Sequence, residues 1–281
     1  MTRTGRPGWT PGALRLSALR AHPDRFKVDN QAGDSNDTAT MWVYDEISWC
    51  GVTAAAFAKE LDGITAPNIT VRLNSPGGDL FDGIAIYNSL VSHPATVHVQ
   101  VDGLAASCAS VIAMAGSTIT MMAGTQMMVH DGLALCIGNA ADMTATAGLL
   151  DKCSNEIAGF YARRAGGDVA AWRDIMRAET WYTGPEALAA GLADEAVTDD
   201  TADEPPDDGA PQARFDLSVF AYAGREHAPP PKAVTANPPI IAPALFDPGA
   251  FRASIKDAAD RSTLQAVVQN YGDLLRAALG R

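Results

Sequence analysis

The feature of this sequence that most limits its fold is the alternation of strand-like and helix-like segments between residues 40 and 198. Residues 68–74, NITVRLN, alternate apolar and polar side chains as a strand does, and residues 82–93, DGIAIYNSLVSH, have helical spacing. The pair recurs at 96–103 and 107–116. Consecutive strand–helix units predict parallel strands joined by right-handed crossovers, and therefore an α/β fold with helices packed on a sheet.

The remaining elements follow the same pattern. Strands are predicted at residues 40–47, 118–124, 125–132 and 193–197, with strand-like residues also at 180–183; helices are predicted at 53–64, 139–165, 169–177 and 184–191. The helix at 139–165 is long and is followed by two glycines, which commonly end helices.

The 281 residues divide into four regions by composition. Residues 1–38 lack a sustained period and are expected to form a flexible arm, whereas residues 39–198 form the folded body. Residues 199–247 are rich in acid and proline and predict a linker, although RFDLSVFAY within it has the pattern of a short docking strand. Residues 248–281 have apolar side chains at helical spacing, which predicts an amphipathic segment for a partner; a tail without a partner is the alternative.

Charge and composition exclude several classes of protein. A net charge of −12 argues against general nucleic-acid binding, which needs a basic surface. No apolar run is long enough to cross a membrane, and residues 1–20 lack the pattern of a signal peptide, so a cytoplasmic location is expected. The four cysteines are far apart and form no CxxC pair, so neither a zinc site nor another metal or cofactor is predicted.

Two strand-to-helix junctions carry the residues of chemical interest. The first, LNSPGGDLFDG at 73–83, has the composition of an ordinary turn, but its glycines would also let main-chain N–H groups approach a ligand. The second places Ser107 at the start of a helix, where serine commonly acts as an N-cap. If Ser107 is instead a nucleophile, the amides of Cys108 and Gly78 could form an oxyanion hole beside it.

A nucleophilic serine needs a base and an acid that orients the base. Of five histidines, His130 is the candidate because it ends an apolar strand just before a turn. Among the carboxylates, Asp131 is too close in sequence and Asp102 lies on the wrong side of the serine. Glu179, between a helix and the strand-like TWYT, is the candidate acid, although a surface glutamate is an equally good interpretation of it.

Four segments, NSPGGDLFDGIAIYNSL, GLAASCASVIAMAG, MMVHDG and TGPEALAAGLAD, together resemble the proteolytic subunit of the Clp protease over residues 41–197. The resemblance implies a Clp protease/crotonase-like fold with Ser107 as nucleophile and His130 as base. It implies Gly78 and Cys108 as the oxyanion amides. It also places Glu179 where the family usually has aspartate, and this departure leaves Asp174 as the alternative acid.

Residues 41–61 and 179–194 resemble more specifically the Clp-related head maturation proteases of tailed bacteriophages. This implies a serine endopeptidase that processes capsid or scaffold proteins, in the host cytoplasm or the procapsid. It also implies homo-oligomeric rings, which could stack through the long helix 139–165 as a handle; any ATP dependence would belong to a separate unfoldase. The alternatives are a cellular Clp-like peptidase that works with an unfoldase, and a non-catalytic assembly protein on a crotonase-like body.

Overall fold

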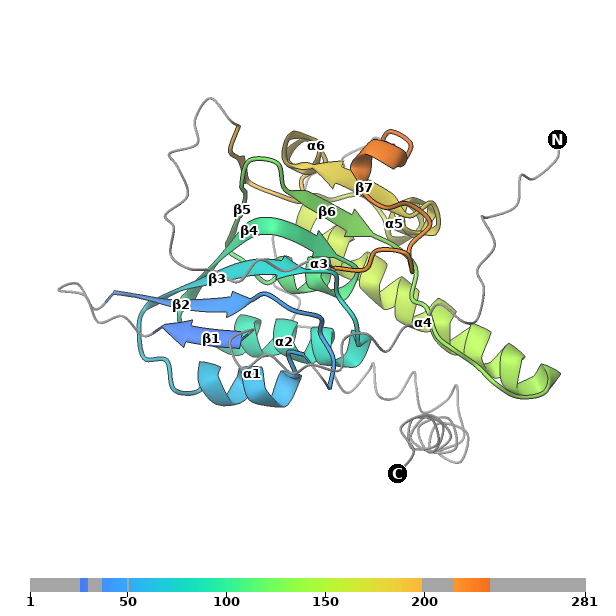
Figure 1. Cartoon of the computed structure of the whole chain (residues 1–281), viewed down its shortest axis with the longest axis horizontal. Coiled ribbons are helices and arrows are strands. Elements are labelled where there is room, and N and C mark those ends of the chain that lie inside the picture. The colour runs from blue at the N-terminus through green and yellow to red at the C-terminus, as the bar shows by residue number, and fades with distance from the viewer. Residues whose placement is uncertain (1–25, 30–36, 50, 199–214, 233–281) are drawn as a thin grey trace.

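The computed structural model describes residues 26–29, 37–49, 51–198 and 215–232, and its centre is a mixed, mostly parallel sheet (Figure 1). Strands β1 to β5 and β8 lie in chain order across it, and β6 joins β4 to β7. All pairs are parallel except β1–β2 and β6–β7. The strands are β1 Phe26–Asp29, β2 Thr38–Val43, β3 Asn68–Ser75, β4 Thr96–Ala106, β5 Thr118–Met121, β6 Gln126–Val129, β7 Thr180–Thr183 and β8 Glu195–Ala196.

The helices form where the sequence predicts them. They are α1 Ala54–Leu61, α2 Leu80–Ser92, α3 Cys108–Ala113, α4 Ala140–Ala165, α5 Val169–Arg177 and α6 Gly184–Ala189, with a short 3₁₀ turn, η2, at Arg225–His227. Side-chain caps fix several starts: Thr53 caps α1, Asp79 caps α2, and Asn139 forms a capping box with Asp142 on α4. None of the helices in the described ranges combines the length and apolar composition that a bilayer span requires.

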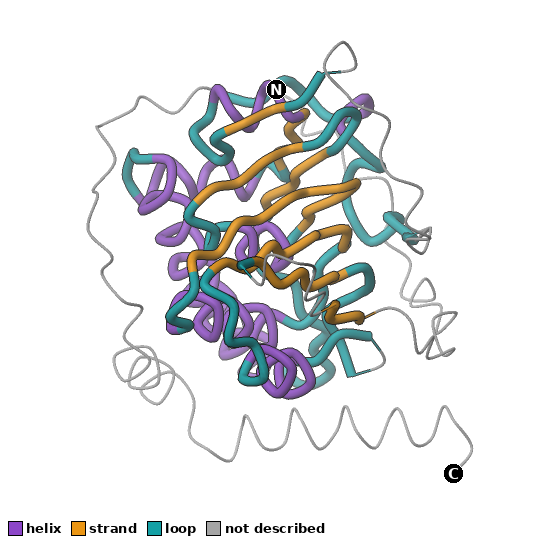
Figure 2. Tube along the Cα trace, turned by 90° about the vertical axis from the view of Figure 1, so that its left-hand side faces the viewer, coloured by secondary structure: helices purple, strands orange, loops and turns teal. Residues whose placement is uncertain are grey.

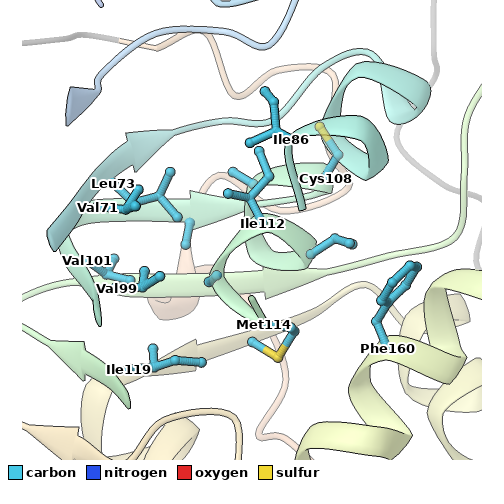
Figure 3. Packing of buried hydrophobic residues seen from close by; sticks show 14 of the residues in the cluster. Val71, Leu73, Ile86, Val99, Val101, Cys108, Ile112, Met114, Ile119 and Phe160 are labelled. Atoms are coloured by element: carbon cyan, nitrogen blue, oxygen red, sulfur yellow. The ribbon is translucent and has the colours of Figure 1, made fainter. Parts of the chain in front are cut away.

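The main core lies between the sheet and the helices on one of its faces (Figure 2). Successive strand residues point to opposite faces, so Val97, Val99 and Val101 of β4 all enter this core. Figure 3 shows Val99 and Val101 of β4 in one cluster with Ile112 of α3 and Phe160 of α4. The α/β prediction is confirmed.

On the edge opposite β3, strand β4 has two successive partners along its eleven residues. Its first half pairs with β5 from His98 to Val101, and its last three residues, Leu104 to Ala106, pair with β6. The β3–β4 register shifts between Leu73 and Ser75, at the level where β4 changes partner. The carboxyl end of β4 therefore meets the end of β6, at the edge where parallel α/β sheets place ligands.

Helix α4 extends well beyond the sheet, as Figure 1 shows. Its 26 residues correspond to about 39 Å of helix. Ile157 and Phe160 in its second half are buried in the core, whereas Met143 in the first half is 46% exposed. The helix is thus a core element at one end and a projection at the other.

Two regions differ from the sequence prediction. Within the expected arm 1–38, residues 26–29 form β1, which pairs with the edge strand β2. Within the expected linker 199–247, residues 215–232 pack on the body, but the predicted docking strand is a series of turns leading to η2. The predicted amphipathic segment 248–281 lies outside the described residues.

Candidate active site

Strand pairing brings Ser107 and His130 together. Ala106, the last residue of β4, is paired with Met128 of β6, and the Ser107 amide donates to the Met128 carbonyl at 3.0 Å. Two residues beyond Met128 the chain leaves β6 at His130. The result is a distance of 2.7 Å between Ser107 Oγ and His130 Nε2, within hydrogen-bond reach.

Ser107 occupies the N-cap position of α3, but its side chain does not cap the helix. Its φ of 56° and ψ of −131° are unusual for a residue other than glycine, and its side chain makes no cap hydrogen bond to α3. Such a conformation costs about 1–3 kcal/mol and is retained when the surrounding structure enforces it, often at functional sites. The side-chain cap that a serine at this position commonly makes is therefore absent, and the hydroxyl contacts the imidazole instead.

The first glycine-rich junction lies directly against the serine. Gly77 and Gly78 have φ of 87° and 142°, which favours glycine at both positions. A Cβ on Gly77 would lie only 2.6 Å from Ser107 Cβ and 3.0 Å from the Cys108 nitrogen. The junction is held by Ile47, whose amide donates to the Gly77 carbonyl at 2.8 Å and whose carbonyl accepts from Asp79 at 2.6 Å.

The amides of Gly78 and Cys108 have no main-chain carbonyl as an acceptor within the described residues. Burial raises the pKa of the Cys108 thiol, and the Gly78 amide, followed by the amide of Cys108 itself, opposes that shift. Both N–H groups therefore lie beside the same side chain at the start of α3. Amides without a main-chain acceptor, next to a serine hydroxyl, are the kind of donor that an oxyanion requires.

The electrostatic environment of His130 favours the neutral imidazole. Burial lowers its pKa below the ordinary 6.5, while the negative charges of Glu179 and Asp131 act in the opposite direction. The ring of Phe220 contacts it edge-on, with the centroids 5.4 Å apart. A neutral imidazole at pH 7 can accept the proton of a serine.

Glu179 lies close enough to affect His130 but is bound elsewhere. Its carboxylate accepts hydrogen bonds from Trp181 Nε1 at 3.2 Å, from the Ala221 amide at 2.7 Å and from the Tyr222 amide at 2.8 Å. No hydrogen bond joins it to His130 in the part of the chain that the structure describes. The backbone of Glu179 is itself left-handed, with a φ of 50°.

Asp174, the alternative acid, is on the solvent side of α5. Its carboxylate pairs with Arg177 at 3.0 Å, and 72% of its side chain is exposed. No hydrogen bond connects it to His130 within the described ranges. Of the two carboxylates, Glu179 is therefore the one associated with the imidazole.

A buried arginine beside the site was not predicted from the sequence. Arg173 of α5 is 3% exposed and binds both carboxylate oxygens of Asp131 at 3.0 Å. It also contacts Asp151 and Asn155 of α4. Asp131, the residue after His130, is thus linked through Arg173 to α5 and α4. The sign of this buried arginine in the sequence was its place next to Trp172 in an otherwise amphipathic helix.

The segment 215–228, here called the strap, was also not predicted to belong to the site. Leu104, Ala106, Met128 and Trp181 point to the sheet face opposite the main core, and apolar strap residues cover them. These strap residues are Phe215, Leu217, Phe220, Tyr222 and Ala228. The alternating pattern of RFDLSVFAY was the available signal, but alternation alone does not show where a segment packs.

A serine hydroxyl held against an imidazole, next to amides that have no main-chain acceptor in the described residues, is the arrangement that serine hydrolases use. Comparison with known families narrows this class, because residues 58–200 match the family model described as Clp protease. The chain belongs to the Clp protease family.

Curated relatives include the ATP-dependent Clp protease proteolytic subunits of Bacteroides fragilis and Porphyromonas gingivalis. The first is 30% identical over 133 residues, 46% of this chain and 64% of the relative. The second is 30% identical over 132 residues, 46% of this chain and 60% of the relative. Subunit 1 of Protochlamydia amoebophila is 31% identical over 129 residues, which cover 44% of this chain and 63% of that protein. The chain thus matches less than two thirds of these relatives' length.

Proposed function

We propose that this protein is a serine endopeptidase in which Ser107 is the nucleophile and His130 the general base. The observation that carries the proposal is the 2.7 Å distance between Ser107 Oγ and His130 Nε2, next to the amides of Gly78 and Cys108, which have no main-chain acceptor within the described residues. Membership of the Clp protease family supports it. A non-catalytic body would not require the serine and the histidine to be in contact.

In the acylation step, Ser107 Oγ attacks the carbonyl carbon of the scissile peptide bond while its proton passes to His130 Nε2. The oxygen of the tetrahedral intermediate accepts hydrogen bonds from the Gly78 and Cys108 amides, a stabilisation worth about 3–4 kcal/mol per donor in comparable sites. The C–N bond then breaks, and His130 returns its proton to the leaving amine. An acyl-enzyme ester on Ser107 remains.

Deacylation repeats these steps with water as the nucleophile. His130 Nε2 takes a proton from water, the resulting hydroxide adds to the ester carbonyl, and the same two amides hold the oxyanion. Collapse of the intermediate breaks the C–O bond and returns the proton to Ser107 Oγ. In this scheme Glu179 stabilises the transient imidazolium through its charge, which already raises the pKa of His130 against the effect of burial.

The test of the nucleophile is labelling of the full chain by a fluorophosphonate probe, followed by peptide mapping. The wild type should be labelled on Ser107, and Ser107→Ala should lose both labelling and peptide hydrolysis. Ser117→Ala, an exposed serine just beyond α3, is the control and should behave as the wild type. Undiminished labelling of Ser107→Ala would refute the assignment.

We extend the proposal to the assembly and its substrates: the protein works in the cytoplasm as a homo-oligomeric ring, and its substrates are capsid or scaffold proteins of a tailed phage. The resemblance of residues 41–61 and 179–194 to head maturation proteases supports this substrate class. The relatives are named as subunits of an ATP-dependent protease, which supports instead a partnership with a separate unfoldase.

Co-expression separates these two substrate classes. The chain, or Ser107→Ala as control, is produced together with the major capsid protein encoded nearest to its gene, and the products are analysed by mass spectrometry. Trimmed capsid protein that depends on Ser107 supports head maturation. Intact capsid protein, together with degradation of an unfolded substrate only when an unfoldase is added, would replace that substrate class with the second.

A further inference from the structure

We propose that the strap, residues 215–228, is part of the active site and positions the carboxylate of Glu179 beside His130. The inference rests on the proposed peptidase function and assigns a role to a segment beyond residue 200, where the family match ends. Its central residues are Phe220, Ala221 and Tyr222.

The first argument comes from the hydrogen bonds of Glu179. Two of its three donors are consecutive main-chain amides of the strap, Ala221 at 2.7 Å on Oε2 and Tyr222 at 2.8 Å on Oε1. One amide for each oxygen fixes both the position and the rotation of the carboxylate. An ionised carboxylate has about four acceptor sites, so the three donors leave one for an imidazole N–H.

The second argument is that the same stretch contacts the base itself. Phe220, immediately before the two amides, meets the ring of His130 at a centroid distance of 5.4 Å and that of Trp181 at 6.1 Å. Trp181 in turn donates to Glu179 through Nε1. One short segment therefore contacts the base and the acid together, and Phe220 covers part of the imidazole.

The third argument is that the strap is firmly anchored. Arg225 forms two hydrogen bonds with the Glu186 carboxylate, at 2.6 Å and 2.7 Å, and its amide donates to Gln126 Oε1 at 2.9 Å. Buried Ala228 packs on the same apolar cluster as Trp181. Anchors on both α6 and β6 hold the two amides in a constant place, as a positioning element requires.

The experiment removes the strap amides one at a time in the full chain. Ala221→Pro and Tyr222→Pro each delete one N–H donor to Glu179. Thr65→Pro is the control, because Thr65 is exposed in the loop between α1 and β3, outside the strap, and its amide donates no hydrogen bond within the described residues. We expect kcat to fall about 10–100-fold in the first two variants with KM unchanged, since the acid acts on the base rather than on substrate binding. Thr65→Pro should stay within about twofold of the wild type. The expected fall is below the roughly 100–10,000-fold contribution of a general base, because each variant removes one donor to the acid and leaves the base in place.

A second pair of variants keeps the inference testable if a proline prevents folding. Phe220→Ala opens the His130 ring to water, whereas Phe220→Leu keeps an apolar cover. The acid limb of the kcat/KM profile should move to higher pH in Phe220→Ala, because less burial allows the pKa of His130 to rise toward 6.5. It should stay near the wild-type position in Phe220→Leu.

The outcomes separate the two proposals. If the wild type is not labelled on Ser107 by the fluorophosphonate, the peptidase proposal fails. If the wild type is labelled but the proline and Phe220 variants keep its kcat and pH profile, only the role of the strap is refuted. Faster labelling and hydrolysis in Ala221→Pro or Tyr222→Pro would also overturn it, since that result means that the strap blocks the site.

Discussion

The contact between the glycine junction and the serine can be tested by adding one methyl group. Gly77→Ala places a Cβ 2.6 Å from both the Ala106 carbonyl oxygen and Ser107 Cβ, whereas ordinary contacts begin at 3.4 Å. The junction and the serine must therefore separate by about 0.8 Å. Displacements of about 1 Å in a catalytic group cost on the order of 100-fold in rate.

The matched control is Gly124→Ala. Gly124 has a φ of 72°, close to the 87° of Gly77, but a Cβ there has nothing within 4 Å. Both variants carry the strain of a left-handed alanine, about 1–2 kcal/mol of unfolding free energy. Only Gly77→Ala adds a clash at the nucleophile, so the comparison isolates the effect on the site.

The assay is the rate of fluorophosphonate labelling together with kcat on a fluorogenic peptide, alongside urea unfolding. We expect Gly77→Ala to lose about 100-fold in both rates, while Gly124→Ala stays within about twofold of the wild type despite a similar φ-dependent loss of stability. Equal rates in the two variants would show that the Gly77 backbone does not define the reacting volume, and the oxyanion assignment would fail with it.

Three further predictions follow from the electrostatics. Because burial lowers the pKa of His130, the acid limb of kcat/KM should have its midpoint below pH 6.5; a midpoint above that value would contradict the buried base. Arg225 lowers the pKa of Glu186 to about 2, so Glu186→Gln should cost about 1–2 kcal/mol, allowing for solvent screening, above pH 4.5. That difference should disappear in urea titrations as the pH falls toward 2, and a pH-independent cost would refute the ion pair. Arg173→Leu leaves Asp131 without its partner and should destabilise the fold by about 2 kcal/mol in the same titrations, whereas an unchanged midpoint would show that the pair contributes nothing.

Much of the fold could be predicted because local patterns agree with the tertiary structure. The alternation in NITVRLN becomes the alternate burial of β3, and Thr53 and Asn139 cap the helices they precede. The β7 segment TWYT is short, but the helices predicted on either side of it limit where this strand can lie. In these places the hydrophobic period, the turn residues and the capping residues indicate the same element.

The pairing of Ser107 with His130 could be proposed but not measured from the sequence, because it depends on the register between β4 and β6. The environment of Glu179 could not be predicted at all. Its donors come from Ala221 and Tyr222, more than forty residues away across an acidic, proline-rich stretch. Any residue except proline can supply a main-chain amide, so the sequence does not show which residues donate to Glu179. Its composition predicted a linker at 199–247, whereas residues 215–232 within that range pack on the body.

Strand β4 pairs with β5 along its first half and with β6 at its end, and this limits where insertions and deletions can occur in the chain. The four-residue stretch from 122 to 125 carries the chain from β5, the partner of the first half of β4, to β6, the partner of its second half. An insertion there can bulge into solvent as long as β6 keeps its pairing, whereas deletion of one residue within 126–129 would move the imidazole by about 3.3 Å and turn it to the other face of the sheet. Changes in length should therefore be tolerated before Gln126 but not within β6, which begins at that residue.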